Sequence, residues 1–108
     1  MVLRLLLFSS LFALASCVGE GKKTEDLPTE TPGQKGESLF INNCAACHGE
    51  DGKLGASGAK DLSISKLNEK QMKEIISKGK NAMPPQKAIL ETDENIQLVI
   101  EHVKRLRK

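Results

Sequence analysis

The apolar and polar positions divide this 108-residue chain into three parts. An apolar run from Leu5 to Leu14 opens it, a polar stretch follows over residues 18–35, and apolar residues then recur at helical intervals from Gly36 onward. No segment alternates apolar and polar residues over the roughly four to eight positions that are typical of a half-buried strand. The pattern therefore predicts an all-α domain over residues 36–108.

The first helix of this domain is expected to run into a cysteine-containing segment. Leu39 and Phe40 share one stripe at helical spacing with Asn43 and Cys44, which places the first cysteine near a helix end. The following stretch, Gly49 to Lys60, holds four glycines and is predicted to be a loop.

Two further helices have clear start and stop signals. Asn68 is a favourable N-cap with Gln71 in the capping-box position, and Gly79 is a suitable end for that helix. Thr92 precedes two acidic residues, whose charges suit the N-terminus of the last helix, while basic residues end it. The apolar residues expected on the inner faces are Met72, Ile75 and Ile76 in the former helix and Ile96, Val99, Ile100 and Val103 in the latter.

The segment Cys44-Ala45-Ala46-Cys47-His48 has the C-x-x-C-H spacing of covalent c-type haem attachment. The chemistry requires this arrangement, because each thiol adds to one of the two vinyl groups on the haem edge. The histidine directly after the second cysteine is then held beside the porphyrin, where it can be the proximal iron ligand. The segment predicts one covalently bound haem c.

Other readings of the two cysteines are less favourable. A C-x-x-C redox pair normally lies in a strand–helix–strand context, which this chain lacks. A four-ligand zinc site needs more ligands nearby, but only Cys17 and His102 remain. A disulfide between Cys44 and Cys47 would be strained.

The composition agrees with a domain that depends on a bound group. The chain has no tryptophan or tyrosine, and Phe8 and Phe12 lie in the N-terminal apolar run, so only Phe40 can join a mature core. A small domain with one aromatic residue buries little apolar surface by itself, and a haem would supply the missing core. The formal net charge of +2 argues against nucleic acid as a partner.

Residues 1–16 are predicted to be a lipoprotein signal peptide. They carry one positive charge, Arg4, and their apolar run is too short to span a membrane. The run ends in Leu14-Ala15-Ser16-Cys17, which resembles a bacterial lipobox. The resemblance implies cleavage before Cys17 and lipidation of that residue, with the protein anchored on the periplasmic side of a bacterial membrane, in either leaflet. The alternative is ordinary cleavage after Ala15, which would leave Cys17 a free thiol.

Residues 17–35 are then the lipidated cysteine and a flexible tether. The segment is polar, has mixed charge and two prolines, and shows no apolar period. Such a segment cannot bury enough apolar surface to order itself. It would let the domain swing between partners at a membrane surface, or it is a spacer whose length has no special significance.

Met83 is the favoured second iron ligand. It lies between the last two predicted helices and is followed by Pro84 and Pro85, which stiffen the backbone. A thioether is a soft ligand that favours ferrous iron and raises the reduction potential. Met72 competes, but its place on an apolar helix face favours a core role. His102 competes as a nitrogen ligand, but packing or exposure is the better interpretation.

Taken together, residues Gly36 to about Leu106 resemble a small monohaem class I cytochrome c. The resemblance rests on Gly36, Phe40, the haem motif with Gly49, the Met83–Pro85 segment and the closing helix. It implies an all-α fold of three to four helices around one covalent haem, with the first and last helices crossing. Gly36 would allow their close approach, and Phe40 would pack against the last helix.

Two departures from the family pattern stand out. The aromatic residue usual in the last helix is replaced by His102, which could stack on Phe40. The proline that usually follows the glycine-rich loop, and whose carbonyl accepts a hydrogen bond from the proximal histidine, is absent from residues 59–62. Another backbone carbonyl can serve, because that bond needs only a C=O group.

The leading functional hypothesis is a non-enzymatic electron carrier. With His48 and Met83 as the two axial ligands, no coordination position stays open for a substrate. The carrier would exchange single electrons with redox partner proteins, whose identity the sequence does not name. A haem enzyme or gas sensor, which needs a displaceable ligand, is the second hypothesis. A structural lipoprotein is the third, and it leaves the histidine and Met83 unexplained.

Overall fold

The computed structural model describes residues 28–108. The predicted signal peptide and the predicted lipidation site at Cys17 lie outside the described residues. Within them, three helices have ten residues or more, and each of the other elements is a single turn. The elements are α1 (Pro32–Asn43), α2 (Ala45–His48), η1 (Ala56–Gly58), η2 (Leu62–Ile64), α3 (Glu69–Lys78), α4 (Lys87–Leu90) and α5 (Asp93–Leu106), where η denotes a 3₁₀ turn.

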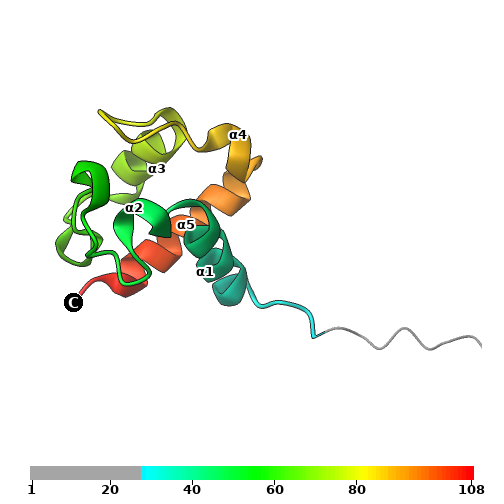
Figure 1. Ribbon diagram of the computed structural model, residues 1–108. Coiled ribbons are helices and arrows are strands. Elements are labelled where there is room, and N and C mark those ends of the chain that lie inside the picture. Colours follow the sequence, from blue (N-terminus) through cyan, green and yellow to red (C-terminus); the bar gives the residue numbers. More distant parts are fainter. Residues whose placement is uncertain (1–27) are drawn as a thin grey trace, which may run out of the picture.

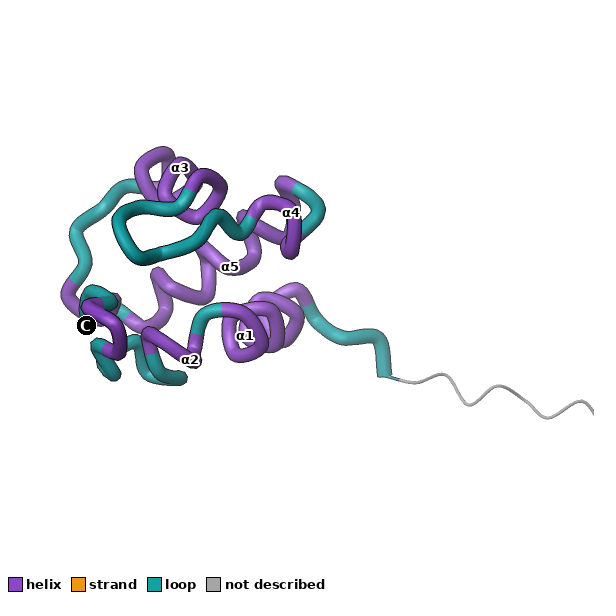
Figure 2. The backbone as a smooth tube through the Cα atoms, turned by 45° about the horizontal axis from the view of Figure 1, so that its top comes forward, coloured by secondary structure: helices purple, strands orange, loops and turns teal. Residues whose placement is uncertain are grey.

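The all-α prediction is confirmed for this part of the chain, which contains no strand. Helix α5 runs through the domain, α1 and α2 lie on one side of it, and α3 and α4 lie on the other (Figures 1 and 2). The buried apolar side chains come from every helix except α2. They are Phe40, Met72, Ile76, Leu90, Ile96, Val99, Ile100 and Val103.

Helix α1 begins at Pro32, ahead of the expected domain boundary at Gly36. Thr31 is its N-cap and forms a capping box with Gln34, whose amide oxygen accepts the Thr31 backbone N–H at 2.9 Å. Proline suits the first helical position, where its missing N–H would have no helical partner. The Thr-Pro-x-Gln signal is present in the sequence, so residues 32–35 belong to the helix rather than to a tether.

The expected crossing of the first and last helices is confirmed. A Cβ atom at Gly36 would lie 2.5 Å from the carbonyl oxygen of Leu98 on α5, so only glycine permits this approach. One helical turn later, the ring of Phe40 lies on the imidazole of His102, with centroids 4.8 Å apart and planes inclined by 39°. A histidine therefore occupies the place of the usual aromatic residue and keeps a ring–ring contact.

The predicted helix signals of α3 and α5 are also confirmed. Asn68 and Gln71 form a capping box, α3 ends at Gly79, and Thr92 caps α5 by accepting the N–H of Asn95 at 3.1 Å. Of the residues expected on the inner face of α3, Ile75 is only half-buried.

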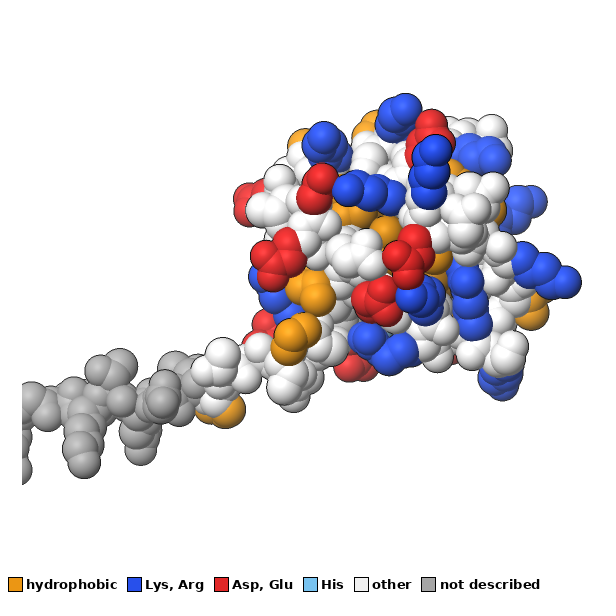
Figure 3. Space-filling model, turned by 180° about the vertical axis from the view of Figure 1, so that it is seen from behind, with side chains coloured by type: hydrophobic (Ala, Val, Ile, Leu, Met, Phe, Trp, Pro, Cys, Tyr) orange, Lys and Arg blue, Asp and Glu red, His pale blue; other side chains and the backbone are white. Residues whose placement is uncertain are grey.

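The outer surfaces of α3 and α5 are joined by exposed ion pairs. Lys104 on α5 pairs with Glu69 on α3 at 2.5 Å, and Lys73 on α3 pairs with Asp93 on α5 at 3.0 Å. Within α5, Lys104 also pairs with Glu101 at 3.1 Å. Seen from behind, side chains of both signs are mixed over the surface (Figure 3). Each exposed pair adds little stability.

None of the helices in residues 28–108 has the length and apolar character needed to cross a membrane.

Candidate functional site

The two cysteines of the motif lie on one turn of helix at the junction of α1 and α2. Cys44 caps the end of α1, and its carbonyl accepts the N–H of His48 at 3.0 Å. Both cysteines carry free thiols. Cys44 is half-buried against the core, and burial raises the pKa of its thiol to about 11, whereas Cys47 is exposed. Because residues three apart share a helix face, both thiols can reach one rigid group.

The imidazole of His48 is oriented by a backbone carbonyl. Its Nδ1 lies 3.1 Å from the carbonyl oxygen of Lys60. A carbonyl can only accept, so Nδ1 carries the proton and donates, which leaves Nε2 unprotonated and available to bind a metal. The expectation that a carbonyl of residues 59–62 replaces the missing proline is therefore met by Lys60.

Asp61 fixes the loop that presents this carbonyl. Its Oδ1 accepts the backbone N–H of Ser63 at 2.8 Å and the Ser63 hydroxyl at 2.6 Å. These hydrogen bonds hold the pKa of the Asp61 carboxyl below its usual value. Ser63 is buried, with 3% of its surface exposed. Sequence reasoning missed this pair, although Asp two residues before Ser is a common turn signal.

Met83 closes a tight turn between α3 and α4. The backbone groups of Lys80 and Met83 exchange two hydrogen bonds of 3.0 Å, and Asn81 between them has a φ of 53°. Gly79, at φ 74°, packs so closely under the turn that a Cβ atom there would collide with the Met83 carbonyl oxygen. The turn is therefore held directly against the end of α3.

Gln86 secures the other side of this segment and was not foreseen. Its backbone N–H donates to the Ile76 carbonyl on α3 at 2.8 Å, and its side-chain amide donates to the Pro84 carbonyl at 3.2 Å. Pro84 and Pro85 have no N–H to donate, so Gln86 is the first residue after Met83 whose backbone can donate to α3. Gln86 and the two prolines together fix the path of the chain after Met83.

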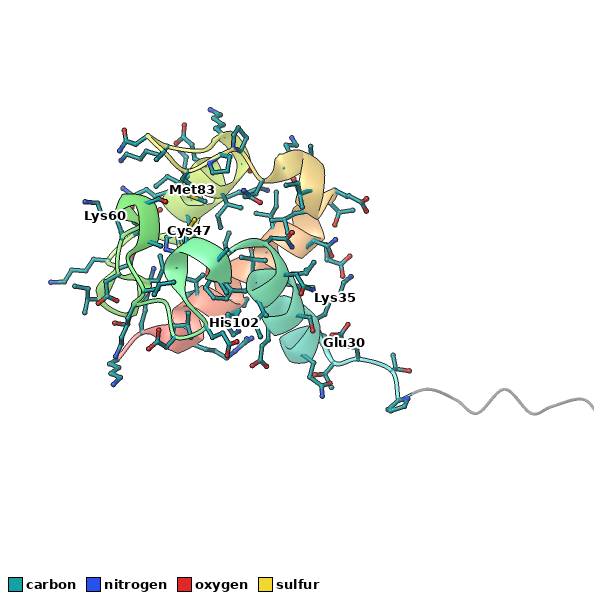
Figure 4. The ribbon with its side chains drawn as sticks, in the orientation of Figure 1. Glu30, Lys35, Cys47, Lys60, Met83 and His102 are labelled. Atoms are coloured by element: carbon teal, nitrogen blue, oxygen red, sulfur yellow. The ribbon has the colours of Figure 1, made fainter. Side chains whose placement is uncertain are left out.

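The candidate site residues do not all lie together. Cys47 and Met83 lie on the same side of the domain as Lys60 (Figure 4), whereas His102 packs against Phe40 at the α1–α5 crossing. Met72 is buried, with 5% of its surface exposed, and its Sδ accepts a hydrogen bond from Arg107 at 3.2 Å. The core interpretation of Met72 and the packing interpretation of His102 agree with these positions.

The residues around the motif fit a haem. Two thiols, an imidazole with a free Nε2 and a thioether form the donor set that attaches and ligates such a group. The neighbouring apolar side chains are packed against the core but remain only partly covered, as expected beside a large planar apolar group. These partly covered residues are Leu39, Cys44, Ala45, Leu62, Leu67, Met83 and Leu106.

Comparison with known proteins identifies the family. Residues 31–103 match the family model described as cytochrome C oxidase, cbb3-type, subunit III. The chain belongs to this family. It is a small monohaem class I cytochrome c with one covalent haem c, and its helices form the all-α cytochrome c fold.

Two curated relatives match the cytochrome domain. One is the cbb3-type cytochrome c oxidase subunit CcoP of Rubrivivax gelatinosus, 37% identical over 73 residues, which are 63% of this chain and 24% of that protein. The other is cytochrome c-555 of Methylococcus capsulatus, 37% identical over 62 residues, or 56% of this chain and 50% of that protein. The chain thus spans half or less of these relatives.

Proposed function

We propose that this cytochrome is a membrane-anchored carrier of single electrons, with His48 as the proximal and Met83 as the distal iron ligand. The observation that carries the proposed ligation is the bond between His48 Nδ1 and the Lys60 carbonyl, 3.1 Å long. It fixes the tautomer in which Nε2 is free to bind iron. The Met83 turn on the same side of the domain supplies a second ligand.

When bound, the haem would supply one-electron redox chemistry at its iron. The chain's own residues fix its surroundings. Cys44 and Cys47 would anchor the haem edge, the Lys60 carbonyl keeps the His48 ring in one orientation, and the segment fixed by Gln86 would carry the Met83 thioether toward the iron.

An enzyme or gas sensor would differ from a carrier in its sixth ligand. The decisive test is the visible spectrum of the purified ferrous protein with and without carbon monoxide. We expect no spectral change on adding the gas at neutral pH, and one reversible one-electron wave in a potentiometric titration. A carbon monoxide complex of the wild-type ferrous protein would favour a displaceable ligand and a catalytic or sensing role.

The partners are proposed to be other redox proteins. One relative is named as a subunit of a cbb3-type cytochrome c oxidase, which supports an oxidase as one kind of electron acceptor. Capture of partners from native membranes, followed by a test of electron exchange with each, would identify donor and acceptor.

We further propose that Cys17 is lipidated and anchors the protein on the periplasmic side of a bacterial membrane. The lipobox resemblance at Leu14–Cys17 supports it. The wild-type protein should require detergent for extraction, and mass spectrometry should show acyl chains on an N-terminal Cys17. Cys17→Ala should be released or left unprocessed, whereas Ser16→Ala should stay anchored. A soluble wild-type protein that begins at Ser16 would contradict the anchor.

A further inference from the structure

His102 is the only histidine of the chain besides His48, and it is enclosed at the α1–α5 crossing. Only 7% of its surface is exposed, and one face of its ring is covered by Phe40. A neutral aromatic side chain would fill this place without any titratable group. A histidine at this position places a group that can bind a proton inside the contact between α1 and α5.

One nitrogen of Arg105 connects this imidazole to the start of α1. The Nη2 atom lies 3.3 Å from His102 Nδ1 and 3.2 Å from the carbonyl oxygen of Gly33. The two hydrogens of this nitrogen suffice for both bonds. The guanidinium therefore bridges α5 and the first turn of α1.

The bridge dictates the protonation state of His102. A guanidinium can only donate, so Nδ1 must accept and must carry no proton. The remaining proton then sits on Nε2, which is buried and has no hydrogen-bond partner. The bridge is thus compatible only with the neutral imidazole, and a second proton would place two donors against each other.

The charges around His102 agree with this conclusion. Arg105 on α5 disfavours the imidazolium, Glu37 on α1 favours it, and burial disfavours it most. The net effect lowers the pKa of His102 below its ordinary value of 6.5. An unfolded chain would bind the proton more readily, so this group's contribution to stability is complete above about pH 7 and is lost as the pH falls through the folded pKa.

We propose that His102 and Arg105 form an acid-sensitive clamp on the start of α1, in which protonation of His102 displaces Arg105 and releases the Gly33 carbonyl. The clamp closes at neutral pH and opens in mild acid. Because Gly33 lies in the first turn of α1, opening would loosen the start of this helix without touching the residues proposed to hold the haem. The inference does not depend on the proposed ligation or anchor.

The test is a nuclear magnetic resonance titration of the ferrous haem-containing protein between pH 7.5 and 4.5, at the His102 imidazole nitrogens and the Gly33 carbonyl carbon. We expect His102 to titrate with a midpoint below 6.5 and the Gly33 carbonyl to shift with the same midpoint. A Gly33 carbonyl that does not titrate with His102, or a His102 midpoint at or above 6.5, would overturn the proposal.

Three variants test whether protonation of His102 causes the change at the Gly33 carbonyl. Arg105→Ala should raise the His102 midpoint and give Gly33, already at pH 7, the carbonyl shift of the acid form. Glu37→Gln removes a charge that favours the imidazolium, so the midpoints of His102 and of the Gly33 carbonyl should fall together. His102→Phe, which keeps the ring contact with Phe40, should abolish the Gly33 titration. If Gly33 still titrates in His102→Phe, surface carboxylates carry the acid response instead. Should that variant fold poorly, the wild-type and Arg105→Ala titrations decide.

Discussion

Replacement of Met83 by alanine is expected to remove the weak far-red charge-transfer band between sulfur and ferric iron. The ferrous variant should bind carbon monoxide, and its reduction potential should fall, because the preference of a thioether for ferrous iron is lost. The turn that carries Met83 is held by backbone hydrogen bonds to Lys80, which alanine retains. The change should therefore affect the ligand more than the fold.

Met72 provides the matched control, since it is the other methionine of the described domain. It is buried against the core and accepts a hydrogen bond from Arg107. Met72→Ala should keep the far-red band and lower the free energy of unfolding by about 2–5 kcal/mol, as is usual for a large-to-small change in a core. Denaturant unfolding and visible spectra of the two variants separate these effects.

The opposite result would reverse the ligand assignment. If Met72→Ala lost the band and Met83→Ala kept it, the core and ligand roles of the two methionines would have to be exchanged. If neither variant lost it, neither thioether would be the source of the band. Loss of the band in both variants, with only Met83→Ala binding carbon monoxide at neutral pH, would still place Met83 on the iron.

The sequence predicted the features of the fold that depend on local chemistry. The cap at Asn68, the end of α3 at Gly79 and the cap at Thr92 follow from side chains that bond to backbone groups within a few residues. The close approach at Gly36 and the stack of Phe40 on a histidine followed from the family resemblance and are confirmed.

Features that depend on contacts between distant segments were harder to foresee. Nothing in the pattern around Leu90 distinguishes it from the exposed Ile89 beside it, yet Leu90 is fully buried because the single turn α4 rests on α5. The choice of Lys60, among the carbonyls of its loop, depends on the Asp61–Ser63 turn and on where His48 points. Spacing along the chain does not specify such pairings.

The start of α1 is a different kind of omission, because its signal was local. The polar composition of residues 18–35 favours a tether that includes Pro32, although proline is also favourable at the first helical position. The four-residue pattern Thr31-Pro32-Gly33-Gln34 at the end of this stretch is the signal that agrees with the structure.

Loss of both motif thiols should have the largest effect on the protein as a whole. The variant Cys44→Ala with Cys47→Ala should show no haem mass after denaturation, whereas the wild type should retain one haem on the chain. The described domain has only eight buried apolar side chains, one of them aromatic, which is a small core for its length. Without a bound group that stabilises only the folded state, we expect a poorly ordered domain by circular dichroism.

The single variants separate the two thiols by their positions. Cys44 is half-buried against the core and lies at the α1–α2 junction, whereas Cys47 is exposed. Cys47→Ala should therefore leave a singly attached haem in a folded domain, while Cys44→Ala should lower both haem retention and the unfolding midpoint. Ala46→Ser, an exposed change within the same turn, is the control and should behave as wild type. A wild-type protein without a covalent haem mass, matured with its attachment machinery, would contradict the role of both cysteines.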